Sequence, residues 1–307
     1  MTQTANTRRR FSGTLNFPEP VKRGETALRR ADIDWEVQAT KLSDLTGKVG
    51  GERWTAAVRT DTDEMIGVNG RRHNVIQNSA LAELGDAIVQ MNDGFAYVGG
   101  GSMYGGSKTF LVLSSDKVFH FGQDDDTGTQ SVLLVNDFDG NCPIQGIGFV
   151  GRYNCMNQMN GLLRRKTGHR LVSVSHTANH TWKLKAAKDT LRALAHEMDD
   201  LEVEIQRLLA FELQRGDAAL VAAGPAPKAD GTNERAITAH EARMTAFLTE
   251  YTRPYNQHLD GTALGAVMAA QGIDEHMSRS ADRETARINR VIGANFPTMR
   301  RVLTVVS

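Results

Sequence analysis

The sequence predicts an α+β fold: an antiparallel sheet of hairpins with packed helices, followed by a helical C-terminal region. Three observations lead to this prediction. Short alternating segments separated by glycine- and aspartate-rich turns occupy the first half of the chain. After Trp182 the apolar residues recur at steps of three and four, which is the period of a helix. The chain has 307 residues, which is enough to bury a sizeable core.

We expect three regions along the chain. Residues 1–28 are predicted to be a flexible basic arm, because three consecutive arginines and two prolines disfavour regular structure. Residues 29–182 are expected to form the α+β core domain. Residues 183–307 are expected to form the helical region, with a loop near 216–234 that is rich in glycine, alanine and proline.

The first elements of the core follow from local patterns. Residues 33–42 and 53–60 alternate like strands, and 61–67 are expected to connect the second of them to a further strand. Residues 78–91 place their apolar side chains on one helical face, with Asn78 as the expected N-cap.

Antiparallel strands are then expected up to residue 153. Three turn-like segments interrupt this part of the chain, at residues 99–106, 124–128 and 136–141. Short strands with turns at such spacing favour antiparallel pairing over alternating strands and helices.

The helical region opens with an apolar seam from Leu184 to Leu208 at a/d spacing, which predicts one long helix that must bury this stripe against another helix. A second helix is expected over 234–255. A third is expected after Gly261 and a fourth over 280–292.

Composition excludes several classes of protein. The 40% hydrophobic and 23% charged content is typical of a soluble globular chain. No apolar run approaches the ~18 residues that a membrane span needs, and the basic N-terminus lacks the apolar core of a signal peptide. Two cysteines make no disulfide framework. We therefore expect a protein of the cytoplasm with no membrane partner.

The formal net charge is zero, but the charge is unevenly distributed. Nine Lys/Arg and one acid lie between Arg152 and Arg192, whereas 193–285 hold sixteen acids and eight bases. A local positive field of this kind favours a polyanionic partner, and the alternative is an ordinary solvated face.

Four motifs that suggest enzymes have simpler interpretations. The segment 101–109 resembles a phosphate-binding loop, but Ser107 separates the glycine from Lys108 and a strand follows where a helix is required. Asp137 and Asp139 could bind a divalent metal, yet Asp-Gly is a common turn pair. Two cysteines and three histidines form a nominal zinc set without a C-x-x-C knuckle: Cys142, Cys155, His169, His176 and His180. No motif of a nucleophile elbow or oxyanion hole frames Cys155. We expect no cofactor, no metal and no catalytic residue.

The basic block is the stronger candidate for a functional site. Its cations stand beside asparagine-rich turns and potential stacking aromatics, the combination that single-strand binders use. The predicted DNA-binding residues are Arg152, Tyr153, Asn157, Arg164, Arg165, Lys166, Arg170, Trp182, Lys183 and Lys185.

Three segments in and around this block, LLVNDFDGN, GFVGRYNCMNQM and SVSHTANHTWKL, resemble successive blocks of a phage and plasmid protein family, domain of unknown function 932. The resemblance covers roughly residues 30–195. The family usually has histidine where this chain has Phe138, so a histidine-dependent role there is not expected. The order of strands leading into a helix is also similar to the core of annealing proteins of the Redβ/RecT type, by analogy of fold alone.

The resemblance and the basic block together imply a non-enzymatic function. We expect an ATP-independent protein of a phage or plasmid that binds and anneals single-stranded DNA in homologous recombination, as a homo-oligomeric ring or helical filament in the bacterial cytoplasm. One alternative is an oligomeric interaction protein that assembles through the helix at 184–208 and binds a host or phage protein. Another is a metal-dependent nucleic-acid enzyme that uses Asp137, Asp139 and His176.

Overall fold

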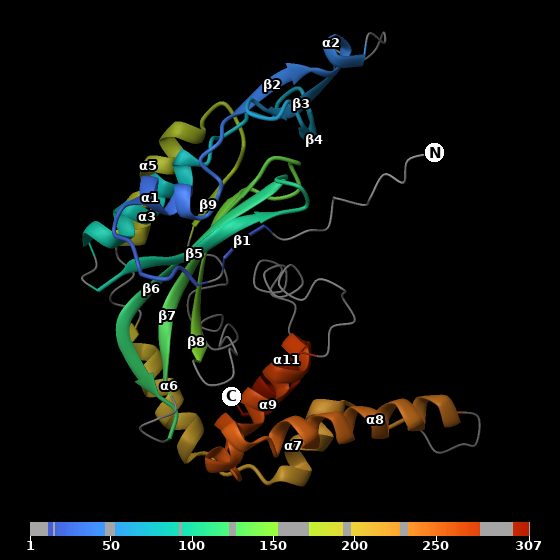
Figure 1. Cartoon of the computed structure of the whole chain (residues 1–307). Coiled ribbons are helices and arrows are strands. Elements are labelled where there is room, and N and C mark those ends of the chain that lie inside the picture. The colour runs from blue at the N-terminus through green and yellow to red at the C-terminus, as the bar shows by residue number, and fades with distance from the viewer. Residues whose placement is uncertain are drawn as a thin grey trace. The chain divides into compact units, whose positions relative to one another are not determined.

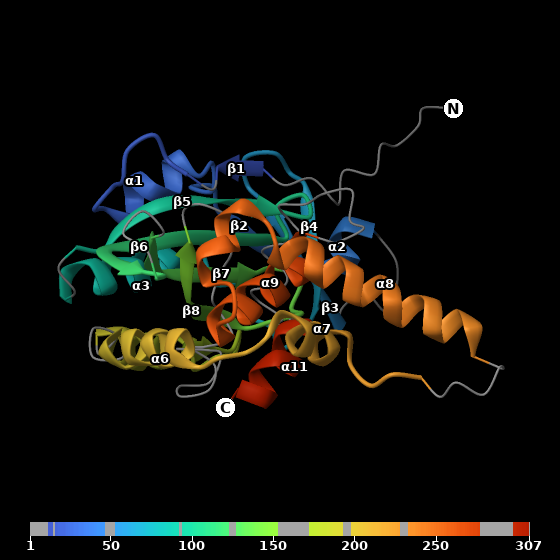
Figure 2. The ribbon, with the colours of Figure 1, turned by 90° about the horizontal axis from the view of Figure 1, so that it is seen from below.

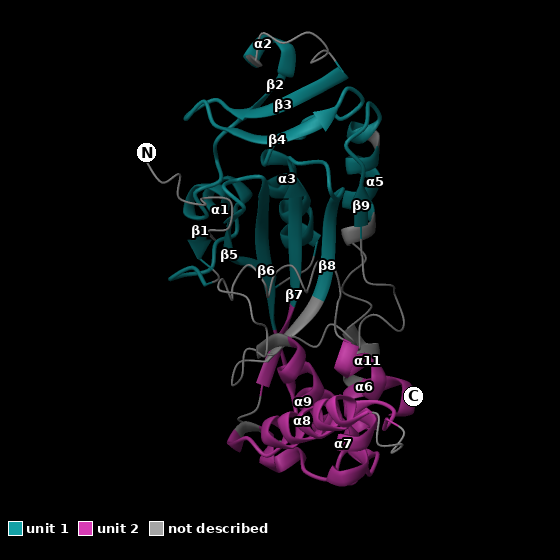
Figure 3. Ribbon diagram, turned by 90° about the vertical axis from the view of Figure 1, so that its right-hand side faces the viewer, with its two compact units in different colours: residues 1–116, 131–148, 170–196 teal, residues 117–130, 149–169, 197–307 magenta. Residues whose placement is uncertain are grey.

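The structure is a computed structural model of the whole chain. It describes residues 12–14, 16–46, 53–91, 94–122, 127–152, 172–192, 198–227, 233–276 and 297–306. Figure 3 shows its two compact units: unit 1 comprises 1–116, 131–148 and 170–196, and unit 2 comprises 117–130, 149–169 and 197–307. Antiparallel sheets and helices are both present, which confirms the α+β class.

A six-stranded sheet in the order β1-β5-β6-β7-β8-β9 forms the framework of unit 1. Its strands are β1 (Ser12–Thr14), β5 (Ala96–Met103), β6 (Lys108–His120), β7 (Thr127–Asp137), β8 (Ile144–Arg152) and β9 (Val172–Val174). The pairs β1–β5, β5–β6 and β8–β9 are antiparallel, as the alternation of short strands and turns predicts.

Three helices cover one face of this sheet: α1 (Gly24–Arg30), α3 (Ser79–Met91) and α5 (His180–Arg192). In Figure 1 they lie together on one side of the strands, and α3 packs against both others. The apolar face of α3 enters a shared core, where Leu81, Leu84 and Ile88 are fully buried. This core fixes the helices to the strands that carry the site.

A second, three-stranded antiparallel sheet completes unit 1. It consists of β2 (Val37–Lys41), β3 (Trp54–Arg59) and β4 (Met65–Gly70), with the short helix α2 (Leu42–Thr46) after β2. A bulge between Ala57 and Val58 shifts the β3–β4 register. An extra residue in one strand breaks strict alternation, and both Ile66 and Gly67 are buried.

Helices and a second apolar core make up most of unit 2. Its elements are α6 (Met198–Ala210), α7 (Arg215–Ala223), α8 (Glu234–Tyr251), the 3-10 helix η4 (Pro254–Leu259), α9 (Ala263–His276) and α11 (Pro297–Val306). The apolar helix α9 packs against α6, α7, α8 and α11, and Leu264, Val267 and Met268 are fully buried. Figure 2 shows α8 extending beyond α7.

Several predicted boundaries are wrong. Within the expected flexible arm, β1 and α1 are regular, and β1 pairs with the sheet. The glycines expected to form a turn at 99–103 belong to β5, because a backbone without Cβ allows β1 to approach closely at Gly101. The expected loop near 216–234 contains most of α7, whose alanines are buried in the core of unit 2.

The predicted long helix over 184–208 is also corrected, because the chain forms two helices that belong to different units. Leu184 and Ala187 of α5 pack into the core of unit 1, while Ile205 and Leu208 of α6 are buried in unit 2. The described members of the apolar stripe therefore stabilise two intrachain cores, whereas the side chains of Leu191, Leu194, Met198 and Leu201 lie outside the description. The expected helix at 280–292 lies outside the described residues.

Asn78 precedes α3, as predicted, but its side chain does not cap the helix. The amide oxygen accepts hydrogen bonds from Thr109 Oγ1 at 2.7 Å and from Asn136 Nδ2 at 3.4 Å. The amide nitrogen donates to the backbone oxygen of Ile33 at 2.9 Å. Asn78 is 2% exposed, so this side chain joins β6, β7 and the segment before β2 in the interior.

Candidate nucleic-acid interface

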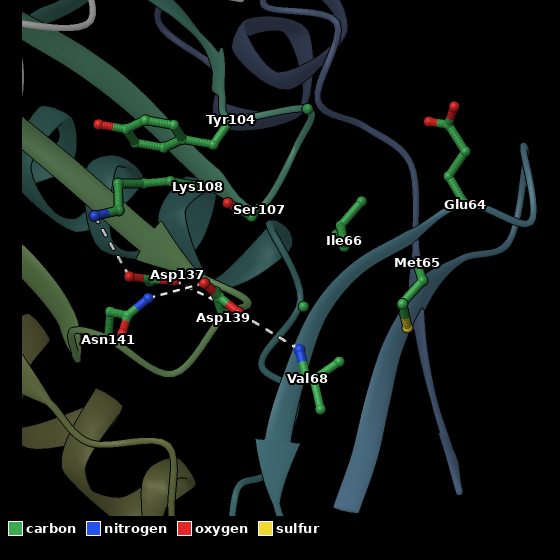
Figure 4. A pocket seen from close by; sticks show the side chains of 12 residues that line it. Glu64, Met65, Ile66, Val68, Tyr104, Ser107, Lys108, Asp137, Asp139 and Asn141 are labelled. Carbon is green, nitrogen blue, oxygen red and sulfur yellow. Dashed lines mark hydrogen bonds and ion pairs between the residues drawn. The ribbon is translucent and has the colours of Figure 1, made fainter. Parts of the chain in front are cut away.

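A pocket of about 760 Å³ opens in unit 1 where three segments meet. The segments are the start of β4, the turn between β5 and β6, and the turn between β7 and β8 (Figure 4). Polar and charged side chains that line it include Glu64, Tyr104, Lys108, Asp139 and Asn141. Each comes from a turn or strand end that the sheet holds in place.

Asp137, at the end of β7, is the buried anion of this pocket, with 1% exposure. One carboxylate oxygen accepts the backbone N–H of Asp139 at 2.8 Å, as in an Asx turn. The other accepts the Cys142 thiol at 3.1 Å and lies 3.4 Å from Lys108 Nζ. Both oxygens of the Asp137 carboxylate therefore already have donors within the protein. The prediction of a turn at 136–141 is confirmed.

Asp139 is exposed at the wall of the same pocket. Its carboxylate accepts Asn141 Nδ2 at 2.9 Å and the backbone N–H of Val68 at 3.5 Å. Figure 4 shows these contacts beside the ion pair of Lys108 with Asp137. A carboxylate has about four lone-pair sites, so Asp139 keeps acceptor capacity toward the pocket.

Phe138, between these two aspartates, anchors the turn to the core. Its side chain is fully buried, and its ring centroid lies 5.7 Å from that of Trp35. Its backbone oxygen accepts Asn69 Nδ2 at 2.7 Å, and its N–H donates to Ser107 O at 2.7 Å. The position where the resembling family has histidine is therefore a packing position in this chain.

A stacked histidine pair lies close to the turn. The rings of His73 and His176 have centroids 4.5 Å apart and an interplanar angle of 15°. His176 Nδ1 lies 3.2 Å from Asn74 O, while neither buried Nε2 atom has a hydrogen-bond partner among the described residues. Burial lowers the pKa of both rings, and that of His176 falls to about 4. The nearby Asp137 carboxylate acts in the opposite direction but does not offset the effect of burial. The pair is neutral at pH 7.

Four side chains at one end of the β3–β4 hairpin form what we call the hairpin-end cluster: Arg53, Trp54, Arg71 and Arg72. The N–H of Arg71 donates to Arg53 O at 3.1 Å, and Trp54 pairs with Gly70 in the register. All four are exposed, Trp54 to 49%, and none of the three guanidinium groups forms an ion pair with a described residue.

A second pocket, of about 520 Å³, begins at this cluster. Arg71, Arg72 and His73 line it, together with Val68 and Asp139, which also line the larger pocket. The two hollows are thus adjacent on the surface of unit 1. The opposite end of the hairpin carries Asp61, Asp63 and Glu64 beside Arg59, which pairs with Asp61, so that end is net negative.

Most of the predicted DNA-binding residues are not placed by the structure. Six lie outside the described residues: Tyr153, Asn157, Arg164, Arg165, Lys166 and Arg170. The side chains of Arg152, at the end of β8, and Trp182, in α5, are likewise outside the description. Lys183 and Lys185 lie on α5, partly buried and exposed respectively. The next cation of that helix, Lys188, pairs with Glu83 at 2.7 Å.

The hairpin-end cluster was not predicted, because residues 53–60 and the segment that follows 61–67 were interpreted only as strands. The two consecutive arginines directly after Gly70, Arg71 and Arg72, were a signal in the sequence. This signal is not informative until the β3–β4 register brings both strand ends together. The cluster is therefore a product of the fold.

The described residues give no support to the metal-dependent alternative. No group of three or more His, Cys, Asp or Glu side chains in the described ranges could hold a metal ion. Asp137 is occupied by protein donors, and His176 is stacked on His73. Cys155 and His169 of the nominal zinc set lie outside these ranges. In the part of the chain with described coordinates, no helix is long and apolar enough to span a bilayer.

Comparisons with known proteins give one match. A family model described as a domain of unknown function (DUF932) matches residues 65–292. No curated protein and no solved structure matches the chain. The matched range begins at β4 and so includes Arg71, Arg72, both pocket turns and α5.

Proposed function

We propose that this chain, which belongs to the DUF932 family of unknown function, binds single-stranded DNA and anneals complementary strands without ATP. The proposal includes the setting that the family resemblance implies, homologous recombination of a phage or plasmid. It also includes assembly as a ring or helical filament.

The hairpin-end cluster is the observation that carries the proposal. Three arginines without acidic partners among the described residues share this end of the hairpin with an indole that is 49% exposed. An exposed indole offers an aromatic face to solvent beside these cations. Single-strand binders combine such cations, which track the phosphates, with aromatic rings on which bases stack.

The described part of the predicted basic block, Lys183 and Lys185, belongs to the same unit as this cluster. His176 begins the link from β9 to α5, and its ring stacks on His73, two residues after Arg71. The N–H of Asn74 donates to His176 O at 3.1 Å. Lys183 and Lys185 follow on α5, so this histidine contact connects the segment that carries Arg71 and Arg72 with the link that leads into the helix of these two lysines.

The proposed mechanism needs no chemical step. Arg53, Arg71 and Arg72 neutralise backbone phosphates, and Trp54 stacks on a base, which holds the strand with its other base edges outward. The cations of the predicted block extend this track. A second strand then pairs with the exposed edges, and base pairing supplies the free energy, so no nucleotide hydrolysis is required.

Salt-dependent binding tests the proposal. We expect purified full-length protein to bind a labelled oligothymidylate with an affinity that falls steeply between about 50 and 200 mM salt. The Arg71→Ala/Arg72→Ala variant should bind more weakly and reduce the slope of log K against log salt by about 2. The matched control is Arg235→Ala/Arg300→Ala, which removes two exposed arginines of unit 2.

The control should bind like the wild type. Absence of salt-sensitive binding by the wild type would refute the proposal. If both double variants lost the same amount of DNA affinity, the hairpin-end cluster would not be the binding site. Electron microscopy with and without the oligonucleotide tests the proposed assembly. We expect rings or helical filaments, and particles of a single subunit in both samples would contradict it.

A further inference from the structure

We infer that the larger pocket receives one unpaired nucleobase of the bound strand, with an amino-bearing edge turned toward Asp139. This inference rests on the proposed function and adds a ligand class to it. Four observations carry it: the location of the pocket, its size, its charge and the conformation of Tyr104.

The location places the pocket next to the phosphate contacts. Val68 and Asp139 line both this pocket and the smaller one formed by Arg71 and Arg72. A strand whose phosphates lie on those arginines passes the mouth of the larger pocket. Its volume of about 760 Å³ falls within the usual range for small-molecule sites, roughly 300–1,000 Å³.

The charge of the pocket excludes a phosphate as its occupant. The only cation among its lining residues, Lys108, lies 3.4 Å from the buried Asp137 carboxylate and is thereby neutralised. Asp139 and Glu64 remain, so the lining is net negative. Such a lining favours ligands that present hydrogen-bond donors. Aspartate accepts hydrogen bonds from the exocyclic amino group of cytosine.

Tyr104 supplies an aromatic face at a strained position. Its φ is +56°, Gly105 follows at +69°, and the N–H of Gly106 donates to Met103 O at 3.2 Å, as in a turn of type I′. Glycine, asparagine or aspartate normally occupies such a position, and another residue there costs about 1 kcal/mol or more. The tyrosine ring lines the pocket, with Lys108 Nζ 6.0 Å from its centroid.

The backbone strain at Tyr104 therefore indicates a functional role for its ring. Asparagine at this position would reduce the strain but would remove the aromatic face. We assign to Tyr104 the stacking contact with the base and to Asp139 the contact with its amino group. Adenine, guanine and cytosine carry such a group, whereas thymine does not. The pocket should discriminate against thymine.

Two matched oligonucleotides test this assignment. Thymine and 5-methylcytosine share the methyl group and ring size but differ in the oxo or amino group at position 4. We expect the wild type to bind an oligomer of 5-methyldeoxycytidine at least about fivefold more tightly than oligothymidylate, as a carboxylate–amino contact implies. Asp139→Asn should bring this ratio close to one, while Arg71→Ala/Arg72→Ala should weaken both affinities and preserve the ratio.

Tyr104→Asn gives an independent readout. It should lower the affinity for both oligomers yet raise the midpoint of thermal unfolding, because asparagine tolerates a positive φ. Equal affinities of the wild type for the two oligomers, with salt-sensitive binding intact, would overturn the base pocket and leave the proposed function standing. Absence of binding to either oligomer would overturn both.

Discussion

The ring of His176 stacks on that of His73 at a centroid distance of 4.5 Å, although the two residues come from different segments of unit 1, 1–116 and 170–196. Both Nε2 atoms are buried without a hydrogen-bond partner in the described part of the chain. A neutral pair tolerates this arrangement, but two imidazolium rings in contact would repel each other in a desolvated site. Protonation of the pair is therefore expected to weaken the contact between the segment after β4 and the β9–α5 link.

Acid should therefore weaken unit 1. The pKa of His176 is lowered by burial, and by the neighbouring His73, from about 6.5 to about 4. Between these values the unfolded chain binds more protons than the folded chain, so stability falls as the pH drops from about 6.5 to 4. The full contribution is roughly 3 kcal/mol, at about 1.4 kcal/mol per unit of pKa.

Urea unfolding of the wild type and of His176→Leu at several pH values between 7.5 and 4 checks this prediction. Carboxylates that titrate in the same range affect both proteins alike, so the difference between the two curves isolates the histidine. The free energies of unfolding should converge as the pH falls. Curves that stay parallel over the whole range would show that His176 does not titrate as described.

Asn78→Ala should destabilise the protein by roughly 2–4 kcal/mol, because it leaves the Thr109 hydroxyl, the Asn136 amide and the Ile33 carbonyl oxygen with a lost partner in the interior. Urea unfolding measures the change. Gln38→Ala, an exposed position on β2, is the control and should stay within about 0.5 kcal/mol of the wild type. A change at Asn78 as small as that of the control would contradict the interior role.

The Asn78 network shows where prediction from the sequence succeeds and where it stops. The alternation at 53–60 and the helical period at 78–91 were sufficient to predict β3 and α3, since both follow from local spacing. The fate of the Asn78 side chain was not predictable in this way. Its partners come from β6, β7 and the segment before β2, which only the tertiary fold brings together.

The candidate site divides in the same manner. The turn at 136–141 was predictable, because Asp-Gly is a local signal. The hairpin-end cluster was not, because Arg53 and Arg71 meet through strand register. The prediction of one long helix over 184–208 was wrong, because regular apolar spacing indicates that a helical face is buried but not which core it contacts.

Trp54→Ala should weaken binding of single-stranded DNA by about 1–3 kcal/mol, the usual contribution of one stacked base. Stability should change little, because the side chain is half exposed. Fluorescence anisotropy with a labelled oligonucleotide measures the loss. Leu45→Ala removes an equally exposed apolar side chain from α2 and should bind normally, and Trp54→Phe should restore part of the affinity. Unchanged binding by Trp54→Ala would exclude stacking there.

Asp274 in unit 2 should respond in opposite directions to two substitutions. Its carboxylate accepts the N–H groups of Thr298 and Met299 at the start of α11, while burial raises its pKa. A raised pKa means that ionisation of this group lowers stability as the pH rises through that pKa. Asp274→Asn keeps an acceptor without the charge and should stabilise at pH 7. Asp274→Ala loses both and should destabilise by about 2 kcal/mol. Thermal unfolding compares them, and destabilisation by both would contradict the charge argument.

Strand annealing without a nucleotide tests the central claim most directly. Two complementary oligonucleotides, one with a fluorophore and one with a quencher, are mixed with the protein in the absence of ATP. The wild type should accelerate quenching well above the spontaneous rate, and Arg71→Glu/Arg72→Glu should not, while Arg235→Glu/Arg300→Glu in unit 2 should behave like the wild type. A wild-type rate equal to the spontaneous rate would contradict the account.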